Sequence, residues 1–281
     1  QSILDGISIA AAANERIYWS EADELAESLR THMQSCQAVK QLEFAGSYRR
    51  GRETVGDLDI LVDSTDAATV MAHFSEYPEL AQVIVQGDTK MSIRVGNSFQ
   101  VDLRVVETEA FGAALQYFTG SKDHNVELRG RAKQLGLKIN EYGVFRVEGD
   151  SETYVAGVTE ETVYQALGLP CFAPEIREAR SEFDWATENA IPDLIRVEQI
   201  QGDLHMHTTA TDGKASLEEM AAAAKARGLK YIAITDHSQR VTVANGLDAE
   251  RLLKQWEEID RINATRIDDF LILKGIERSE E

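Results

Sequence analysis

A glycine-serine turn followed by two alternate aspartates is the feature that most constrains the fold of this 281-residue chain. The apolar run 42–45 leads into Gly46 and Ser47. A glycine lets the backbone approach a ligand closely, and a helix that starts there directs free N–H groups at an anion. Arg50 adds a planar guanidinium that suits phosphate oxygens. The segment therefore predicts a phosphate-binding turn between a strand and a helix.

Three aspartates are predicted to share one face of a sheet. Asp57 and Asp59 start the apolar run 57–62, and side chains alternate along a strand, so both point away from the core. Asp102 stands in the alternating run 99–105, which we expect on an adjacent strand. Clustered carboxylates repel one another unless a cation lies between them, and hard oxygen ligands beside a triphosphate favour magnesium. We therefore predict a two-metal site for Mg²⁺ or Mn²⁺.

These motifs, taken together with those that follow them, resemble the family X DNA polymerases. The resemblance covers nearly all of the first 190 residues and continues at Tyr117-Phe118-Thr119-Gly120-Ser121, His124-Asn125, Leu128-Arg129 and Ile139-Asn140-Glu141-Tyr142-Gly143. It implies that the three aspartates are catalytic metal ligands. It implies that the incoming dNTP contacts Gly46, Ser47, Arg50, Gly56, Tyr117, Phe118, Gly120 and Asn125. It implies that DNA contacts Arg104, Lys122, Arg129 and Tyr142.

A second group of motifs begins near residue 200. We expect a strand over 196–200, after which His205 and His207 alternate and Asp212 follows. Ser216 and Glu219 then form a capping box that predicts a helix over 217–227, closed by Gly228. Two further apolar runs, at 231–234 and 271–273, predict strands that lead to His237 and Glu277.

Strands and helices in alternation, with such residues at the strand ends, predict the start of a (β/α) barrel. Imidazoles with carboxylates suit zinc, manganese or iron, and a multi-metal site suits phosphoester hydrolysis. The ordered set His-x-His, Asp-Gly, Asp-His and Gly-x-Glu resembles the PHP (polymerase and histidinol phosphatase) domain. This resemblance implies a Mn²⁺ or Zn²⁺ site formed by His205, His207, Asp212, His237 and Glu277.

The predicted fold class combines α/β and α+β parts: a nucleotidyltransferase-like palm with a mixed sheet and helices, then the first strands of a PHP-type barrel. The predicted parts are a helical segment 1–40, the palm 41–116, a nucleotide- and template-contacting subdomain 117–187, a linker 188–199 and an incomplete PHP domain 200–281. This order resembles the bacterial branch of family X. That branch also has an N-terminal lyase region and a full PHP barrel, so we interpret the chain as a fragment, and the sequence leaves open whether its PHP site is active.

Composition is consistent with an intracellular protein of two cores. Hydrophobic residues make up 43% of the chain, no apolar run reaches membrane-spanning length, and Cys36 and Cys171 have no motif partners. We expect a cytoplasmic, nucleoid-associated monomer. The net charge of −19 is unusual for a DNA-binding protein, yet the stretch 90–146 has more basic than acidic residues.

The resemblance implies a template-directed, gap-filling repair polymerase that transfers a nucleotide from a dNTP to the 3′-OH of gapped or primer-template DNA, followed by a 3′ exonuclease-type phosphoesterase domain. Two alternatives stay open. One is a template-independent nucleotidyltransferase, against which Asn125 and Arg129 argue. The other is a non-catalytic gap-binding repair module, against which the three intact aspartates argue.

Overall fold

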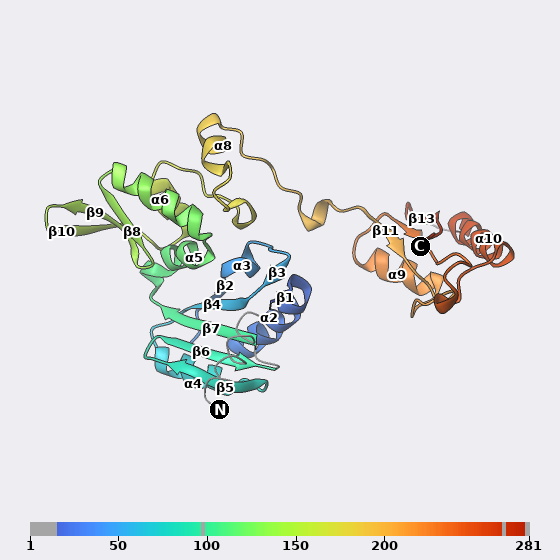
Figure 1. Ribbon diagram of the computed structural model, residues 1–281, viewed down its shortest axis with the longest axis horizontal. Coiled ribbons are helices and arrows are strands. Elements are labelled where there is room, and N and C mark those ends of the chain that lie inside the picture. The colour runs from blue at the N-terminus through green and yellow to red at the C-terminus, as the bar shows by residue number, and fades with distance from the viewer. Residues whose placement is uncertain (1–15, 97–98, 266–267, 279–281) are drawn as a thin grey trace, which may run out of the picture. The chain divides into compact units, whose positions relative to one another are not determined.

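Two compact units make up the chain, and the division between them lies between Pro192 and Asp193. The structure, a computed structural model, describes residues 16–96, 99–265 and 268–278 (Figure 1). Each unit has its own sheets and its own hydrophobic core. The division falls within the segment that the sequence predicts as a linker. Of the predicted helical segment 1–40, the first fifteen residues lie outside the described part of the chain.

The first unit is built on a five-stranded mixed sheet with the order β2-β4-β7-β6-β5. β4 pairs with β7 in parallel, and the other neighbours are antiparallel. Its strands are β2 (Gln41–Phe44), β4 (Asp57–Asp63), β5 (Leu80–Gln86), β6 (Lys90–Val95) and β7 (Phe99–Val106). A separate two-stranded ladder joins β1 (Ile17–Tyr18) to β3 (Thr54–Val55). This is the mixed sheet that the sequence predicts for the palm.

Alternation along β4 gives the sheet two different faces. Leu58, Ile60 and Val62 are buried in the main core with residues of α2 (Trp19–Gln34) and α4 (Ala67–Ser75). Leu61 lies on the opposite face and packs with apolar residues of α5 (Phe111–Thr119). Asp57 and Asp59 belong to that opposite face and remain partly exposed. Burial of Leu58, Ile60 and Val62 on one face of β4 therefore keeps Asp57 and Asp59 on the other face.

Helices and a smaller sheet complete the first unit. After α5 come α6 (Lys122–Gln134) and the antiparallel strands β8 (Leu137–Asn140), β9 (Gly143–Glu148) and β10 (Ser151–Ala156). Two short helices follow, α7 (Glu160–Ala166) and α8 (Glu182–Glu188). Their core includes Tyr164, Phe172 and Phe183. His124 is buried among these rings, and its nitrogens contact Glu182 and the Tyr164 hydroxyl at 2.8 and 2.9 Å.

A buried ion-pair network joins the palm sheet to this helical part. Glu160, the first residue of α7, accepts two hydrogen bonds from Arg49, at 2.9 and 2.7 Å, and one from Arg177 at 2.5 Å. Arg177 is fully buried, and Arg49 is the last residue of α3 (Gly46–Arg49). Burial alone would raise the pKa of Glu160, but the hydrogen bonds from Arg49 and Arg177 hold it below its ordinary value. This carboxylate therefore fixes the Gly46 turn relative to α7.

The second unit begins a parallel α/β fold. Its sheet has the order β11-β12-β13, with strands β11 (Gly202–Met206), β12 (Tyr231–Ile234) and β13 (Leu271–Lys274). Helices α9 (Leu217–Ala226) and α10 (Ala249–Thr265) connect them. The predicted capping box is present, because the Glu219 N–H donates to Ser216 Oγ and the Ser216 N–H donates to Glu219 Oε2. Parallel strands need such helical crossovers, so the predicted alternation is confirmed.

One predicted strand is wrong. Residues 196–200 contain a 3-10 helix, Val197–Gln199, and the first strand of the unit starts at Gly202. Val197 and Ile200 are spaced three residues apart, which suits a helical turn better than alternation, and both side chains are exposed. The Arg196 N–H donates to Gln199 Oε1 at 2.8 Å and holds the turn.

None of the helices in the described residues combines the length and the apolar character that a membrane span requires.

We expect Glu160→Ala to lower the free energy of unfolding by about 3–5 kcal/mol, because it leaves the buried Arg177 and the partly buried Arg49 without their carboxylate. Urea denaturation followed by circular dichroism measures the change. Glu152→Ala is the matched control, since Glu152 pairs with Lys138 at the surface and should cost less than about 1 kcal/mol. Equal losses in the two variants would contradict the importance of the network.

Candidate active site and metal centre

The parallel pairing of β4 and β7 brings the three predicted aspartates to one face. Asp59 lies opposite Asp102 in the register, and Asp57 lies opposite Gln100. Asp57 and Asp59 are partly exposed, whereas Asp102 is 9% exposed. Asp102 accepts a hydrogen bond from Gln100 Nε2 at 3.1 Å. The predicted acidic cluster is thus assembled from two adjacent strands.

Mutual repulsion and burial perturb these carboxylates. Burial raises the pKa of Asp57, and the nearby charge of Asp102 raises it further. Burial, followed by the charges of Asp57 and Asp102, raises the pKa of Asp59 to about 7. Raised values mean that the negative charge is incompletely compensated by the protein. Oxygen ligands with uncompensated charge fit a hard divalent cation such as Mg²⁺ or Mn²⁺.

The turn that precedes β4 borders this cluster. Gly46 has a φ of +64°, and a Cβ atom on it would lie 2.6 Å from Asp59 Oδ2. Only glycine fits there, because a side chain would both strain the backbone and collide with the carboxylate. The Ala45 N–H also donates to the Asp59 carbonyl at 2.8 Å. Ser47 follows Gly46 in the short helix α3.

Arg50 directly follows α3 and has two partners of its own. Its Nε donates to Glu178 Oε1 at 2.9 Å, and its Nη1 donates to the Thr119 carbonyl at 2.5 Å. The guanidinium is therefore fixed in orientation. It lines a cavity of about 260 Å³ that also contains most of the residues predicted to contact nucleotide or DNA: Tyr117, Phe118, Gly120, Lys122, Asn125 and Arg129.

Asn125 is engaged within the protein. Its Nδ2 donates to the Tyr117 carbonyl at 2.7 Å, and its Oδ1 accepts from Gln116 Nε2 at 2.7 Å. The side chain is 9% exposed. Because an amide nitrogen carries two N–H donors, contact with a base pair from this position does not require loss of the bond to Tyr117.

Three further predicted residues are not among those that line this cavity. Arg104 places its guanidinium over the Phe118 ring at 4.3 Å, and its Nε has no hydrogen-bond partner in the described structure. Tyr142 lies in the turn between β8 and β9 and is 64% exposed. Gly56 precedes β4, and a Cβ atom there would lie 3.0 Å from Arg16 Nη1.

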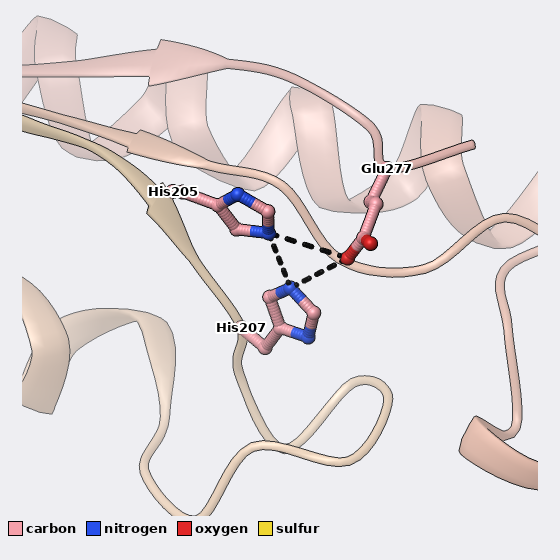
Figure 2. Close-up of side chains that lie close together, drawn as sticks. All are labelled: His205, His207 and Glu277. Atoms are coloured by element: carbon pink, nitrogen blue, oxygen red, sulfur yellow. Dashed lines mark hydrogen bonds and ion pairs between the residues drawn. The ribbon is translucent and has the colours of Figure 1, made fainter. Parts of the chain in front are cut away.

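The predicted metal ligands of the second unit converge at the carboxyl ends of its strands. His205 lies in β11, His207 follows it, and Glu277 follows β13. Figure 2 shows these three side chains pointing toward one another. The Nε2 atoms of His205 and His207 lie 3.2 Å apart, and they lie 3.3 and 2.9 Å from Glu277 Oε2.

Asp212 and His237 extend this cluster. Asp212 contacts His207 Nδ1 at 3.0 Å and His237 Nε2 at 3.4 Å, and His237 Nδ1 lies 3.2 Å from Glu277 Oε2. The hydrogen bond with His207 is the main reason that the pKa of Asp212 is lowered. Two overlapping groups of three ligand atoms each lie within 4.8 Å: His205, His207 and Glu277, and His207, Asp212 and His237. Mixed imidazole and carboxylate donors fit transition-metal ions.

Comparison with known proteins agrees with both halves of this description. Family models match the DNA polymerase beta palm at residues 16–98, the DNA polymerase beta thumb at 114–178 and the PHP domain at 203–277. The DNA polymerase/3'-5' exonuclease PolX of Bacillus subtilis is 42% identical over 280 residues, which is 99% of this chain and 48% of that protein. This chain belongs to the family X DNA polymerases that carry a PHP domain.

Relatives of lower identity match smaller parts of this chain. DNA polymerase lambda of Rattus norvegicus is 29% identical over 192 residues, covering 58% of this chain and 33% of that protein. A crystal structure of Leishmania infantum polymerase beta in a ternary P/T complex has a TM-score of 0.54 and 26% identity over 62% of this chain and 80% of the other. The chain spans about half the length of its Bacillus relative and about a third of DNA polymerase lambda.

Two basic residues beside the three aspartates, Arg16 and Lys90, are not among the site residues predicted from the sequence. Arg16 donates to the Thr54 side chain and carbonyl, and its charge opposes the rise in the pKa of Asp57. Lys90 Nζ lies 3.7 Å from Asp102 Oδ2. Arg16 lies far from the motif in sequence, but Lys90 was accessible to prediction because it starts the alternating strand before β7.

In the metal-free protein, we expect the contribution of Asp59 to stability to be lost as the pH rises from about 4 to 7. The pKa of Asp59 is about 7 in the folded protein against an ordinary 3.8, so the folded state keeps a proton that the unfolded state releases. The stabilisation is complete below the unfolded value and is lost as the pH rises through 7, with a limiting slope of about 1.4 kcal/mol per pH unit.

Urea denaturation in EDTA at several pH values measures this dependence. Asp59→Asn, which cannot ionise, should remove the contribution. A variant whose profile had the same slope as the parent would contradict the assignment.

Proposed function

We propose that this chain is a template-directed DNA polymerase that fills gaps during DNA repair by transferring a nucleotide from a dNTP to a primer 3′-OH. The observation that carries the proposal is the cluster of three carboxylates beside the Gly46 turn. Arg50, which follows this turn in the chain, lines the cavity described above. The names of the relatives, DNA polymerases PolX and lambda, support it. The proposed substrate is gapped or primer-template DNA, which the ternary P/T and ternary gap complexes of Leishmania infantum polymerase beta support. The protein is proposed to act as a monomer.

The aspartates would hold the cations of this reaction. Asp57, Asp59 and Asp102 are the residues proposed to bind two Mg²⁺ or Mn²⁺ ions, which supply Lewis-acid activation of the hydroxyl and stabilisation of the pyrophosphate. The raised pKa values of Asp57 and Asp59 support this role, because both groups gain from a nearby positive charge.

The phosphates would bind at the Gly46 turn. The backbone N–H groups of Gly46 and Ser47, with Gly56 nearby, offer donors without side-chain obstruction, and Arg50 offers a guanidinium already oriented by Glu178 and Thr119. Orientation before binding reduces the entropy cost of holding a flexible triphosphate.

The cavity residues would test the nascent base pair. Tyr117, Phe118 and Gly120 would contact the sugar, and the Asn125 amide would contact the minor-groove edge, where adenine N3 and thymine O2 are equivalent acceptors. One donor can then check pair geometry without choosing a base. The DNA contacts proposed are Lys122 and Arg129 at the cavity, together with Arg104 and Tyr142.

The two alternative functions have less support. A template-independent nucleotidyltransferase does not need Asn125 and Arg129 in the same cavity as the nucleotide-binding arginine. A non-catalytic gap-binding module does not need three carboxylates whose clustering costs electrostatic energy. Extension of a primer only with the complementary nucleotide would exclude both.

We expect Asp102→Ala to lower single-nucleotide gap filling more than about a hundredfold, because it removes a metal ligand. Its thermal stability should be equal or higher, since one source of like-charge repulsion is gone. The assay is extension of a gapped duplex with Mg²⁺ and one complementary dNTP. Asp88→Ala, an exposed aspartate between β5 and β6, is the matched control and should extend normally. Normal extension by Asp102→Ala would contradict the site.

For the second unit we propose a metal-dependent phosphoesterase that removes nucleotides from a DNA 3′ end. His205, His207, Asp212, His237 and Glu277 would bind Mn²⁺ or Zn²⁺, which supplies an activated water for the hydrolysis. The 3'-5' exonuclease in the name of the Bacillus relative supports this reaction. The exposed His205 would face incoming DNA, whereas the less exposed His207 and His237 lie deeper in the cluster.

We expect His205→Ala to abolish Mn²⁺-stimulated release of nucleotides from a labelled 3′ end while gap filling continues. Asp102→Ala is the reciprocal control and should keep the hydrolysis, because its aspartate belongs to the other unit. Hydrolysis that survives His205→Ala and disappears in Asp102→Ala would assign the reaction to the palm and refute the proposal.

A further inference from the structure

A buried carboxylate that is not among the predicted ligands lies immediately before His237. Asp236 is 1% exposed, and both of its oxygens accept hydrogen bonds. Oδ1 accepts from the Thr208 N–H at 2.8 Å and from the Thr211 hydroxyl. Oδ2 accepts from the Thr208 hydroxyl at 2.7 Å and from Gln255 Nε2 at 2.5 Å. With four donors on its two oxygens, the carboxylate has little capacity left to bind a metal ion directly.

Two partners of the Asp236 side chain are sequence neighbours of the proposed ligands. Thr208 directly follows His207, and Thr211 directly precedes Asp212. The main-chain carbonyl of Asp236 also accepts from the Glu277 N–H at 3.1 Å. Asp236 itself is joined by the backbone to His237. One residue is therefore bonded to the chain beside four of the five ligands.

The loop between His207 and Asp212 depends most on these hydrogen bonds. Of the five proposed ligands, Asp212 lies farthest along the sequence from a strand, and its side chain is exposed. Its position depends on a loop whose two threonines turn inward to the same carboxylate. Removing that acceptor leaves buried donors without partners, so the loop has to rearrange.

We propose that Asp236 is the positioning residue of the PHP metal centre: it fixes the His207 to Asp212 loop against His237 and Glu277, so that all four ligands face one point. The inference rests on the proposed function of the second unit as a metal centre. Groups that orient metal ligands without touching the metal typically change affinity by about 10–100-fold when removed.

The test is the affinity for Mn²⁺, measured by electron paramagnetic resonance of the free ion with the full chain. All variants carry Asp57→Asn and Asp102→Asn, which disable the palm site. We expect Asp236→Asn to weaken Mn²⁺ binding about 10–100-fold, because an amide replaces one acceptor oxygen by a donor. Gln255→Leu, which removes one donor to Asp236 from α10, should weaken it less and in the same direction, and it serves if Asp236→Asn does not fold.

Asn263→Ala is the matched control. Asn263 makes two hydrogen bonds to the backbone of Ile272, at 2.8 and 3.0 Å, and none to a ligand. It should lower the melting temperature and leave Mn²⁺ affinity unchanged at temperatures where the protein is folded. Affinities of Asp236→Asn and Gln255→Leu equal to that of Asn263→Ala would overturn the inference. Parent binding that His205→Ala leaves intact, or no parent binding, would instead refute the metal centre itself.

Discussion

The parallel pairing of β4 with β7 is the constraint on which the acidic site depends. It sets Asp59 opposite Asp102, and a slip of one residue would turn these carboxylates toward α2 and α4. The register is held by the apolar side chains of the same strands, among them Leu58 and Ile60, which are fully buried. Burial of the apolar face thus offsets the repulsion on the acidic face. The raised pKa of Asp59 is the sign of that opposition, and a bound cation would relieve it.

The two arginines that end the Gly46 turn connect this site to the helical part in different ways. Arg49 is paired with the buried Glu160 and so stabilises the fold, whereas Arg50 is paired with the less buried Glu178 at the edge of the cavity. Adjacent residues in the chain therefore separate a structural role, that of Arg49, from the proposed binding role of Arg50. A substitution at Glu160 should act on stability first, and one at Arg50 should act on nucleotide affinity first.

The sequence predicted what local periodicity controls and missed what depends on distant contacts. Alternation around Asp57 and Asp102 was enough to place them on one face, and the residues after two apolar runs indicated His237 and Glu277. The partners of Arg49 and Arg50 are 111 and 128 residues away, and no periodic pattern links such positions. The strand predicted at 196–200 is wrong because its apolar residues were few and three apart. The role of a buried carboxylate such as Asp236 could not be predicted, because its hydrogen-bond donors come from other parts of the chain.

The two units differ in the side chains that make up their proposed metal sites. In the palm, three carboxylates crowd together and the pKa values of Asp57 and Asp59 rise, so metal binding there should compete with protons and weaken as the pH falls. In the second unit, imidazoles alternate with carboxylates, and the hydrogen bond with His207 holds the pKa of Asp212 down before any metal arrives. Asp212 therefore remains ionised to lower pH than Asp59.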